Sequence, residues 1–491
     1  MEAPSVSDEA QTAGSPATFR EVFAADEFRF LFVSVALSWI GDYIAKAAVT
    51  VLVYRETESV ALSAAAFAVS FLPWLIGGPL LTTVAERHPY HRVMITTDLI
   101  RMALIAVVAT PGLPVWAMIS LLFCTTLANP PNQAARSALM PTVLTGDRLI
   151  VGLSLIASTG QLAQVGGYIA GAAIASVNPR AALLLNATTF AVSALVIRLG
   201  VRARPAATTP DRRQHLLRET AEGFQLVWRT DVLRAIAILV WTVPLFAIVP
   251  EGLAAAWAAE PGVSDSERGL AQAMIMAASP TGYIVGGLLI GRLVRPGRRR
   301  RLIRPFAVIA PLALVPTLLD PSPPVVAVLA GVCGFAVAGL LPVTNGLFVQ
   351  ALPHGYRARA FGVIATGIQV GQGAAVLVTG LLADRFDIPT VVGLWSLTGA
   401  VVISLALLRW PAEERFDAAI AAVAAAPGAA TGAAPGAATG GGSSAAGTGT
   451  ADTTETPGTS AAGSAAGAAA SNGNPVPQAR DAQQADEVGS A

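Results

Sequence analysis

The sequence predicts an all-α membrane protein with twelve transmembrane helices in two parallel six-helix halves. Three observations support this fold class. Hydrophobic residues make up 54% of the 491 residues and charged residues only 13%, whereas soluble domains carry about 25% charged residues. Apolar segments of roughly 20 residues, the length that crosses a bilayer, recur along the chain. Arginine gathers on every second connection between them, so a soluble fold is disfavoured.

The predicted helices are separated by connections rich in Pro, Gly and Arg, such as residues 109–112 and 320–324. The first six are expected at residues 30–54, 60–84, 93–110, 114–138, 149–176 and 180–200. The second six are expected at residues 233–258, 269–293, 303–319, 324–350, 359–382 and 389–410. The third and ninth of these segments are the shortest.

Three polar regions flank and divide the two halves, which span residues 30–200 and 233–410. Residues 1–29 form an N-terminal segment without the pattern of a removable signal peptide. Residues 201–232 form a linker in which Leu217, Ala221, Phe224 and Trp228 recur at helical spacing, which predicts an amphipathic helix on the inner membrane surface. Residues 411–491 are dominated by Ala, Gly, Thr, Ser and Pro, so we expect a disordered tail.

The distribution of basic residues predicts the orientation. Of the 32 Lys and Arg residues, 26 fall on one set of alternate connections and termini, and only Arg55, Arg180, Arg268 and Arg385 fall on the other set. Cytoplasmic connections carry the excess of Lys and Arg. We therefore expect both termini, and thus residues 1–29 and the tail, in the cytoplasm, with the protein in a bacterial plasma membrane.

The two halves share an internal repeat. Pro130 and Pro141 in the first half correspond to Pro342 and Pro353 in the second, at an offset of about 210 residues. Parallel repeats of this kind predict a central cavity for a solute.

Several classes of function lack their sequence signals. Cys124 and Cys333 lie in apolar stretches and the four histidines lie in connections, so neither a disulfide framework nor a metal site is expected. Lys46 is the only lysine and no Gly-rich loop surrounds it, which argues against a phosphate-binding loop and ATP-driven transport. No nucleophile with a base is evident, so we expect neither catalysis nor a cofactor. The basic run Arg298–Arg301 suits a cytoplasmic connection near anionic lipid better than nucleic acid.

Four motifs carry a family resemblance. They are residues 72–80 (LPWLIGGPL) followed by Ala85, Glu86, Arg87 and Arg92; residues 40–42 (IGD); residues 98–101 (DLIR); and residues 131–141 (PNQAARSALMP). Together they resemble the major facilitator superfamily, and more narrowly its enterobactin-exporter and macrolide-efflux branch. The resemblance implies solute transport by alternating access. Gly167 and Asn186 depart from the branch, which often has Pro and Asp there, and so weaken the case for drug–proton antiport.

Asp42 is the first candidate for mechanism. It lies about 18 Å into the first predicted helix, near the middle of the bilayer, where a charge is costly and usually functional. Lys46 follows at i+4, on the same helix face. Asp42 either takes up a proton or meets a cationic solute, with Lys46 supporting its charge, or the two form a static ion pair.

A second group of charges suggests a gate. Asp98 and Arg101 are expected near the cytoplasmic end of the third helix, where they would pair with Arg87 and Glu86, with Arg92 close by. The resemblance implies that this cluster latches the two halves in the outward-facing state. The alternative is that these are solvated surface charges.

Four further polar residues are candidates for binding the solute. Glu251 is expected near the outer face, where it either binds solute or reaches interfacial water. Gln161, Gln164 and Gln369 lie in apolar segments, where they either line the cavity or only bond between helices.

The sequence therefore predicts a proton-coupled exporter of a small amphipathic metabolite, antibiotic or siderophore. Its expected partners are the solute, protons and the lipid bilayer, with no nucleic acid, and the chain is expected to be a monomer. A nutrient importer of the same fold and a non-transporting membrane sensor or scaffold remain the alternatives.

Overall fold

The computed structural model describes residues 18–73, 88–204, 216–259, 265–353 and 357–425. The described residues form helices and no strands, and they belong to one compact unit that spans residues 1–433. The helices of the first half are α2 (Phe19–Phe23), α3 (Asp26–Thr57), α4 (Val60–Ala68), α6 (Tyr90–Val108), α7 (Val115–Leu127), α8 (Asn129–Val143), α9 (Asp147–Val177) and α10 (Pro179–Gly200). The linker and the second half contain α11 (Leu216–Arg229), α12 (Asp231–Ala247), α13 (Val249–Ala258), α14 (Asp265–Leu293), α15 (Pro296–Arg299), η2 (Arg300–Leu302), α16 (Ile303–Leu312), η3 (Val315–Leu319), α17 (Pro323–Ala351), α18 (Arg357–Ala383), α19 (Ile388–Leu408) and α20 (Glu413–Ala425).

Nine helical stretches in the described part are long and apolar enough to cross a membrane, and they match nine of the expected helices. The other three expected helices take other forms. The segment 60–84 begins as α4, and its residues 74–84 lie outside the described residues. The segment 93–110 is α6, a helix of 19 residues whose apolar character is interrupted by Asp98 and Arg101.

The fourth expected helix, 114–138, is broken into α7 and α8. Pro130 and Pro131 follow the break directly and occupy the first turn of α8. Proline has no backbone N–H, so it fits the start of a helix and interrupts the hydrogen-bond ladder of a longer one. The same effect divides the seventh expected helix into α12 and α13, since Pro244 lies near the end of α12 and Pro250 in the first turn of α13.

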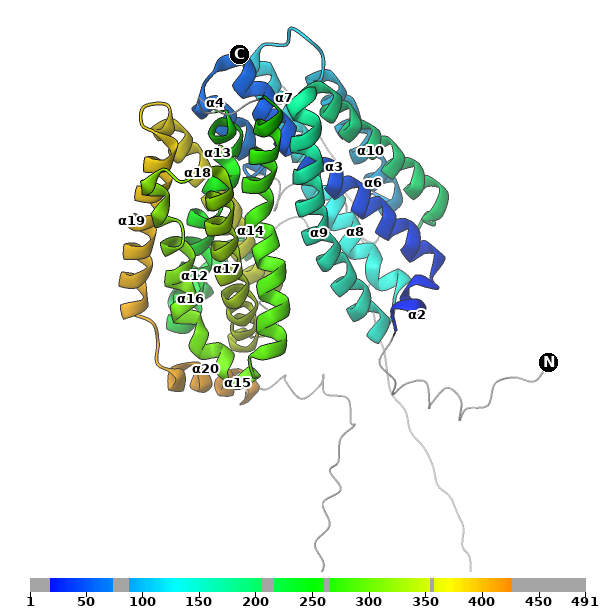
Figure 1. Ribbon diagram of the computed structural model, residues 1–491. Coiled ribbons are helices and arrows are strands. Elements are labelled where there is room, and N and C mark those ends of the chain that lie inside the picture. Colours follow the sequence, from blue (N-terminus) through cyan, green and yellow to red (C-terminus); the bar gives the residue numbers. More distant parts are fainter. Residues whose placement is uncertain (1–17, 74–87, 205–215, 260–264, 354–356, 426–491) are drawn as a thin grey trace, which may run out of the picture. The chain divides into compact units, whose positions relative to one another are not determined.

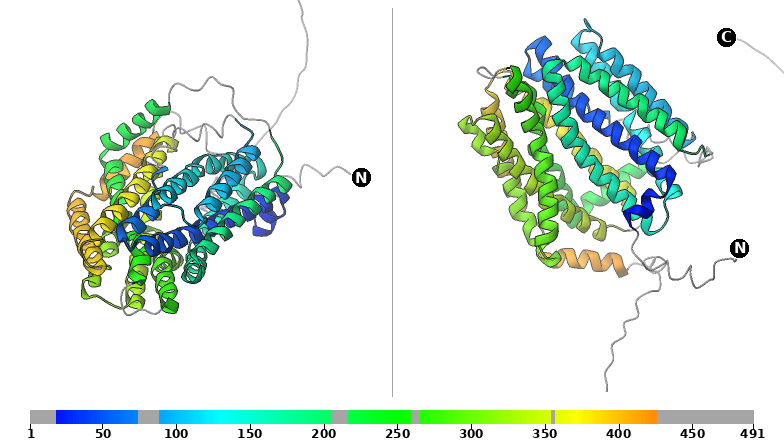
Figure 2. Two further views of the ribbon diagram at one scale, coloured as in Figure 1. Left: turned by 90° about the horizontal axis from the view of Figure 1, so that it is seen from above. Right: turned by 45° about the vertical axis from the view of Figure 1, so that its right-hand side comes forward.

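Each half packs around one central helix. In the first half α3 contacts α9 and α10, and in the second half α12 contacts α16, α17, α18 and α19. Figure 1 shows α3, α6, α8, α9 and α10 as one group and α12, α14, α16, α17 and α19 as another, and Figure 2 shows the same groups in two further views. Gly171 of α9 faces the backbone of Ile44, so the lack of a side chain allows α3 and α9 to approach closely.

The two halves contact each other through α9 with α14 and through α4 with α18. At the end predicted to face outward, Asp384 directly after α18 accepts hydrogen bonds from Ser59 Oγ (3.0 Å) and the Ala61 amide (3.0 Å). Further in, Gln272 of α14 donates to the Ala47 carbonyl oxygen of α3 at 3.0 Å. These polar contacts tie the first half to the second at one end of the bundle.

The linker contains the expected helix. α11 buries Val227, while Phe224 and Trp228 remain nearly half exposed and stack on each other with centroids 5.6 Å apart. Trp228 also stacks against Trp241 of α12. The linker therefore contains a helix that packs against the second half, while its place on the inner membrane surface stays a prediction.

The expectation of a disordered tail from residue 411 was wrong for residues 413–425, which form α20. Alanine favours helix, and Glu413 and Glu414 in the first turn suit the positive end of the helix dipole. Phe416 is 4% exposed and packs against Trp410, which anchors the helix to the bundle. The remaining tail, 426–491, lies outside the described residues.

Candidate functional site

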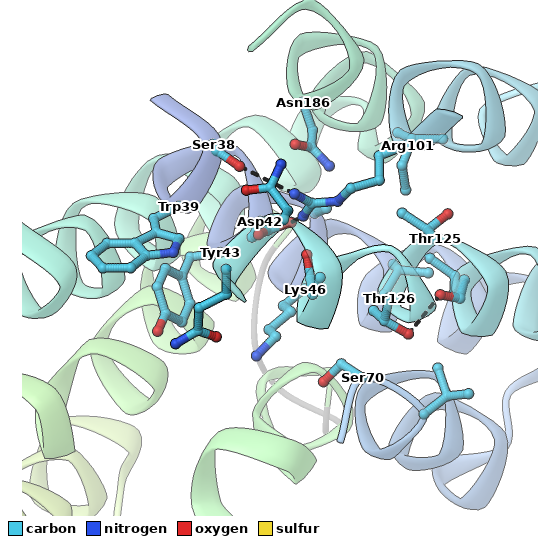
Figure 3. A pocket seen from close by; sticks show the side chains of 18 of the residues that line it. Ser38, Trp39, Asp42, Tyr43, Lys46, Ser70, Arg101, Thr125, Thr126 and Asn186 are labelled. Atoms are coloured by element: carbon cyan, nitrogen blue, oxygen red, sulfur yellow. Dashed lines mark hydrogen bonds and ion pairs between the residues drawn. The ribbon is translucent and has the colours of Figure 1, made fainter. Parts of the chain in front are cut away.

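A polar cavity opens between the helices of the first half, with one contribution from the second (Figure 3). Its wall comes from α3, α4, α6, α7, α8 and α10, and from Gln369 of α18. The charged side chains that line it are Asp42, Lys46, Arg101 and Arg136. Four expected site residues therefore line the same cavity: Asp42, Lys46 and Arg101 from the first half and Gln369 from the second.

Asp42 is held by Arg101. The guanidinium donates through Nη2 to Asp42 Oδ1, and its Nη1 lies 3.2 Å from Ser38 Oγ and 3.8 Å from Asp98 Oδ1. Arg101 is only 2% exposed and stacks on the ring of Phe190 at 4.0 Å, whereas the Asp42 side chain retains 25% exposure toward the cavity. One arginine thus joins two carboxylates, of which only Asp42 lines the cavity.

Asp98 has two hydrogen-bond donors besides its contact with Arg101. It accepts hydrogen bonds from Ser193 Oγ at 2.6 Å and Asn132 Nδ2 at 3.1 Å. Asn132 in turn accepts from Arg136 Nη2 at 2.7 Å. The interpretation of Asp98 and Arg101 as solvated charges was wrong, because their side chains are 1% and 2% exposed.

Lys46 does not form the expected ion pair with Asp42. Its ammonium lies over the rings of Tyr43 (5.2 Å), Phe67 (5.8 Å) and Phe71 (5.0 Å), and within the described residues it has no ion pair. Figure 3 shows the side chain directed toward Ser70 and away from Arg101. Because Arg101 occupies the carboxylate, the lysine packs on aromatic faces, which attract cations.

Glu251 lies in the interior rather than at an interface. It is 4% exposed and accepts hydrogen bonds from Tyr168 Oη at 3.1 Å and Gln164 Nε2 at 3.5 Å. The expectation that it reaches interfacial water was wrong, because every residue of α13 is buried among neighbouring helices. The contact joins α13 of the second half to α9 of the first, and Tyr168 packs edge-on against Tyr43 of the cavity wall.

The remaining predicted residues are less closely connected to the cavity. Gln161 is half-buried on α9, and Arg92 is exposed in the first turn of α6. Glu86 and Arg87 lie outside the described residues, so their proposed pairing with Asp98 and Arg101 stays a prediction. Among the described residues no cluster of His, Cys, Asp and Glu is suited to a metal ion.

Sequence reasoning missed several residues that the structure brings to the site. Arg136 was counted among cytoplasmic connections, yet it is 9% exposed, lines the cavity, and lies 5.7 Å from the ring of Trp39. The signal was present, because Asn132 and Arg136 are spaced i and i+4 inside a quoted motif and therefore share a helix face. Tyr168 and Gln272 carried no comparable signal.

The family model described as Major Facilitator Superfamily matches residues 31–258 and 232–434. Macrolide efflux protein A of Streptococcus pyogenes is 23% identical over 401 residues, covering 78% of this chain and 95% of the relative. Macrolide efflux protein A of Enterococcus faecalis is 25% identical over 309 residues, covering 59% and 91%.

Solved structures show the same fold at low identity. A POT family transporter in complex with 5-aminolevulinic acid has a TM-score of 0.62 at 11% identity, covering 81% of this chain and 98% of that chain. The nucleoside transporter NupG has a TM-score of 0.58 at 13% identity, covering 78% and 100%.

Proposed function

This chain belongs to the major facilitator superfamily, and we propose that it exports a small amphipathic solute across the bacterial plasma membrane in exchange for protons. Membrane transport follows from the family. The direction, the coupling ion and the class of solute are the proposal.

The observation that carries the proposal is the Asp42–Arg101 pair at the cavity wall. A carboxylate in the membrane interior is costly and is retained where it serves an ion or solute path. A proton that reaches Asp42 removes its charge and weakens its hold on Arg101, while Asp98 at 3.8 Å remains as the second partner of the guanidinium. Protonation therefore changes the charge on the part of the cavity wall that α3 and α6 form. A change of this kind favours one of the two conformational states of an alternating-access cycle over the other.

Export is supported by the names of two relatives, which are macrolide efflux proteins. Asp384, Ser59 and the Ala61 amide bridge the halves at the end predicted to face outward. With both termini in the cytoplasm, as the arginine distribution predicts, these contacts belong to an inward-facing state, through which importers and exporters both pass. The cavity combines aromatic walls, such as Trp39 and Tyr43, with charged groups, which suits an amphipathic solute such as an antibiotic, a siderophore or another metabolite.

Other site residues take supporting roles in this proposal. Glu251, with Gln164 and Tyr168, forms a second buried carboxylate site where the halves meet. Gln369 contributes to solute contact from the second half, and Gln161 lies on the same helix as Gln164. The protein acts as a monomer in the bilayer, without nucleic acid.

The proposed gate combines Asp98 and Arg101 with Glu86, Arg87 and Arg92. Arg87→Ala is expected to slow transport without preventing insertion into the membrane, because a latch affects switching between states rather than folding. Transport rates and membrane abundance of the variant are measured together; an unchanged rate contradicts the gating role.

The test is accumulation of fluorescent dyes and macrolide antibiotics in cells that express the wild type, Asp42→Asn or Asp320→Asn. Asp320 is exposed in the connection before α17, so it provides a matched loss of one carboxylate. We expect wild type and Asp320→Asn to lower accumulation, and expect Asp42→Asn or a protonophore to abolish the effect. No difference across the panel would favour import of another solute.

The scaffold alternative is tested by deleting residues 426–491, which leaves α20 intact. A transporter is expected to keep its activity without these residues, because the cavity lies in residues 38–369. Loss of function with normal membrane abundance would favour a tail-dependent scaffold or sensor.

A further inference from the structure

A basic pocket lies at the predicted cytoplasmic end of the second half, away from the central cavity. We define it by Arg300, Arg301, Arg304, Leu347, Trp410 and Phe416. Its wall comes from η2, α16, α17 and the start of α20, and α20 packs against α17. Figure 1 labels α15 and α20 near each other at this end.

The charges of the basic pocket are not balanced by its own wall. Three arginines face a single carboxylate, Glu413. Arg300 donates to Asp417 of α20 at 2.8 Å. Arg301 and Arg304 are exposed and have no ion pair within the described residues. Two guanidinium groups are therefore available for an anion, and their planar donor arrangement suits phosphate oxygens.

A second feature continues from the basic pocket along the membrane-spanning helices. A groove between α14 and α17 shares Arg300 and Leu347 with the pocket, and we call it the glycine groove after Gly287, Gly291 and Gly346. A Cβ added at any of these three glycines would meet no atom within 4 Å, so the groove is open space rather than a tight helix contact. Its remaining wall is largely apolar.

We propose that the basic pocket and the glycine groove together bind one anionic phospholipid of the inner leaflet. The phosphate group lies between Arg301 and Arg304, and an acyl chain follows the glycine groove along α14 and α17. The arginine distribution places this end at the cytoplasmic leaflet, which carries anionic lipids that basic pockets attract. Trp410 suits the headgroup level, where aromatic rings are enriched.

The test is titration of the purified full chain with phosphatidylglycerol, followed by native mass spectrometry. Arg301→Gln/Arg304→Gln removes two charges from the pocket, and Arg295→Gln/Arg298→Gln removes two exposed charges from the same basic segment without touching the pocket wall. We expect the pocket pair to weaken binding about thirtyfold, from two basic contacts, and the control pair to weaken it clearly less, because its charges do not contact the phosphate. Equal losses in the two variants would overturn the site in favour of diffuse attraction.

Three further binding experiments identify the chemistry of the ligand. Phosphatidylcholine should bind more weakly than phosphatidylglycerol, and equal binding contradicts the role of the arginines. Free glycerol phosphate should not compete at matched concentration; if it does, the pocket binds soluble phosphate and not lipid. Gly346→Leu fills the groove and should weaken phosphatidylglycerol binding. Unchanged binding would show that no acyl chain lies in the groove. Gel filtration checks folding, and the single variant Arg304→Gln replaces the pair if the pair does not fold.

Discussion

At the scale of single residues, the site depends on how one arginine is shared. Arg101 is buried, contacts both Asp42 and Asp98, and rests on Phe190. Removing one member of a buried ion pair is costly, because the other charge is left without compensation. The cost depends on which member is removed.

Arg101→Gln is expected to destabilise the protein more than Asp42→Asn. Without Arg101 two carboxylates lose their cation, at a cost of about 3–5 kcal/mol in the free energy of unfolding. Without Asp42 the guanidinium keeps Asp98 at 3.8 Å and Ser38 at 3.2 Å. Thermal unfolding of the detergent-purified variants measures the difference, and equal losses would contradict the shared-arginine arrangement.

A second residue-scale prediction concerns Glu251. Glu251→Gln retains an oxygen that accepts from Tyr168, so folding should be close to that of the wild type, while transport should fall if the charge has a role. Tyr168→Phe instead leaves the buried carboxylate with one fewer donor, and we expect a loss of about 1–3 kcal/mol of stability. Stability and dye export are measured for both variants. Normal export by Glu251→Gln would show that the Glu251 carboxylate has a structural role only.

The sequence singled out Asp42 as a carboxylate in an apolar helix but did not identify its partner. Lys46 is four residues away along one helix, whereas Arg101 reaches Asp42 across 59 residues of sequence. Local spacing favours the near neighbour, and only the packing of α3 and α6 against α10 decides the outcome. Asn132 and Arg136 were visible in a motif, but their burial was not.

At the scale of helices, the packing of α13 explains why Glu251 does not reach water. Glu251 was placed near the outer face by counting 1.5 Å per residue along one continuous helix. That count describes position along the helix and not its neighbours, and the residues of α13 are buried against α4, α14 and α18. Whether a side chain reaches water depends on packing between helices, which residue counting does not describe.

The contact of Asp384 with α4 gives a prediction at this scale. Asp384→Ala removes the acceptor of Ser59 Oγ and of the Ala61 amide, two bonds that join the halves. We expect this outer end to open more often, and a spin-label pair placed on α4 and α18 should report longer distances. Asp387→Ala, in the same connection and without a side-chain capping bond, is the control. Identical distance distributions in the two variants would contradict a latch at Asp384.

At the scale of the whole molecule, the fold was the most predictable feature. Long apolar segments and the motifs were sufficient, because the bilayer demands helices of a fixed length. The tail was the exception, since α20 depends on Phe416 packing against Trp410, a contact that composition does not reveal. The two halves, joined through the contacts of α4, α9, α13, α14 and α18, provide the frame for alternating access.

The central claim is that proton uptake at Asp42 drives export. The most direct measurement uses proteoliposomes with an acidic lumen and a dye or macrolide that the cellular assay identifies. Wild type and Asp320→Asn should accumulate the solute in the lumen only while the pH gradient lasts, in exchange for protons, and Asp42→Asn should not. The claim is contradicted if Asp42→Asn accumulates the solute at the wild-type rate under the gradient. It is also contradicted if accumulation by the wild type does not depend on the pH gradient.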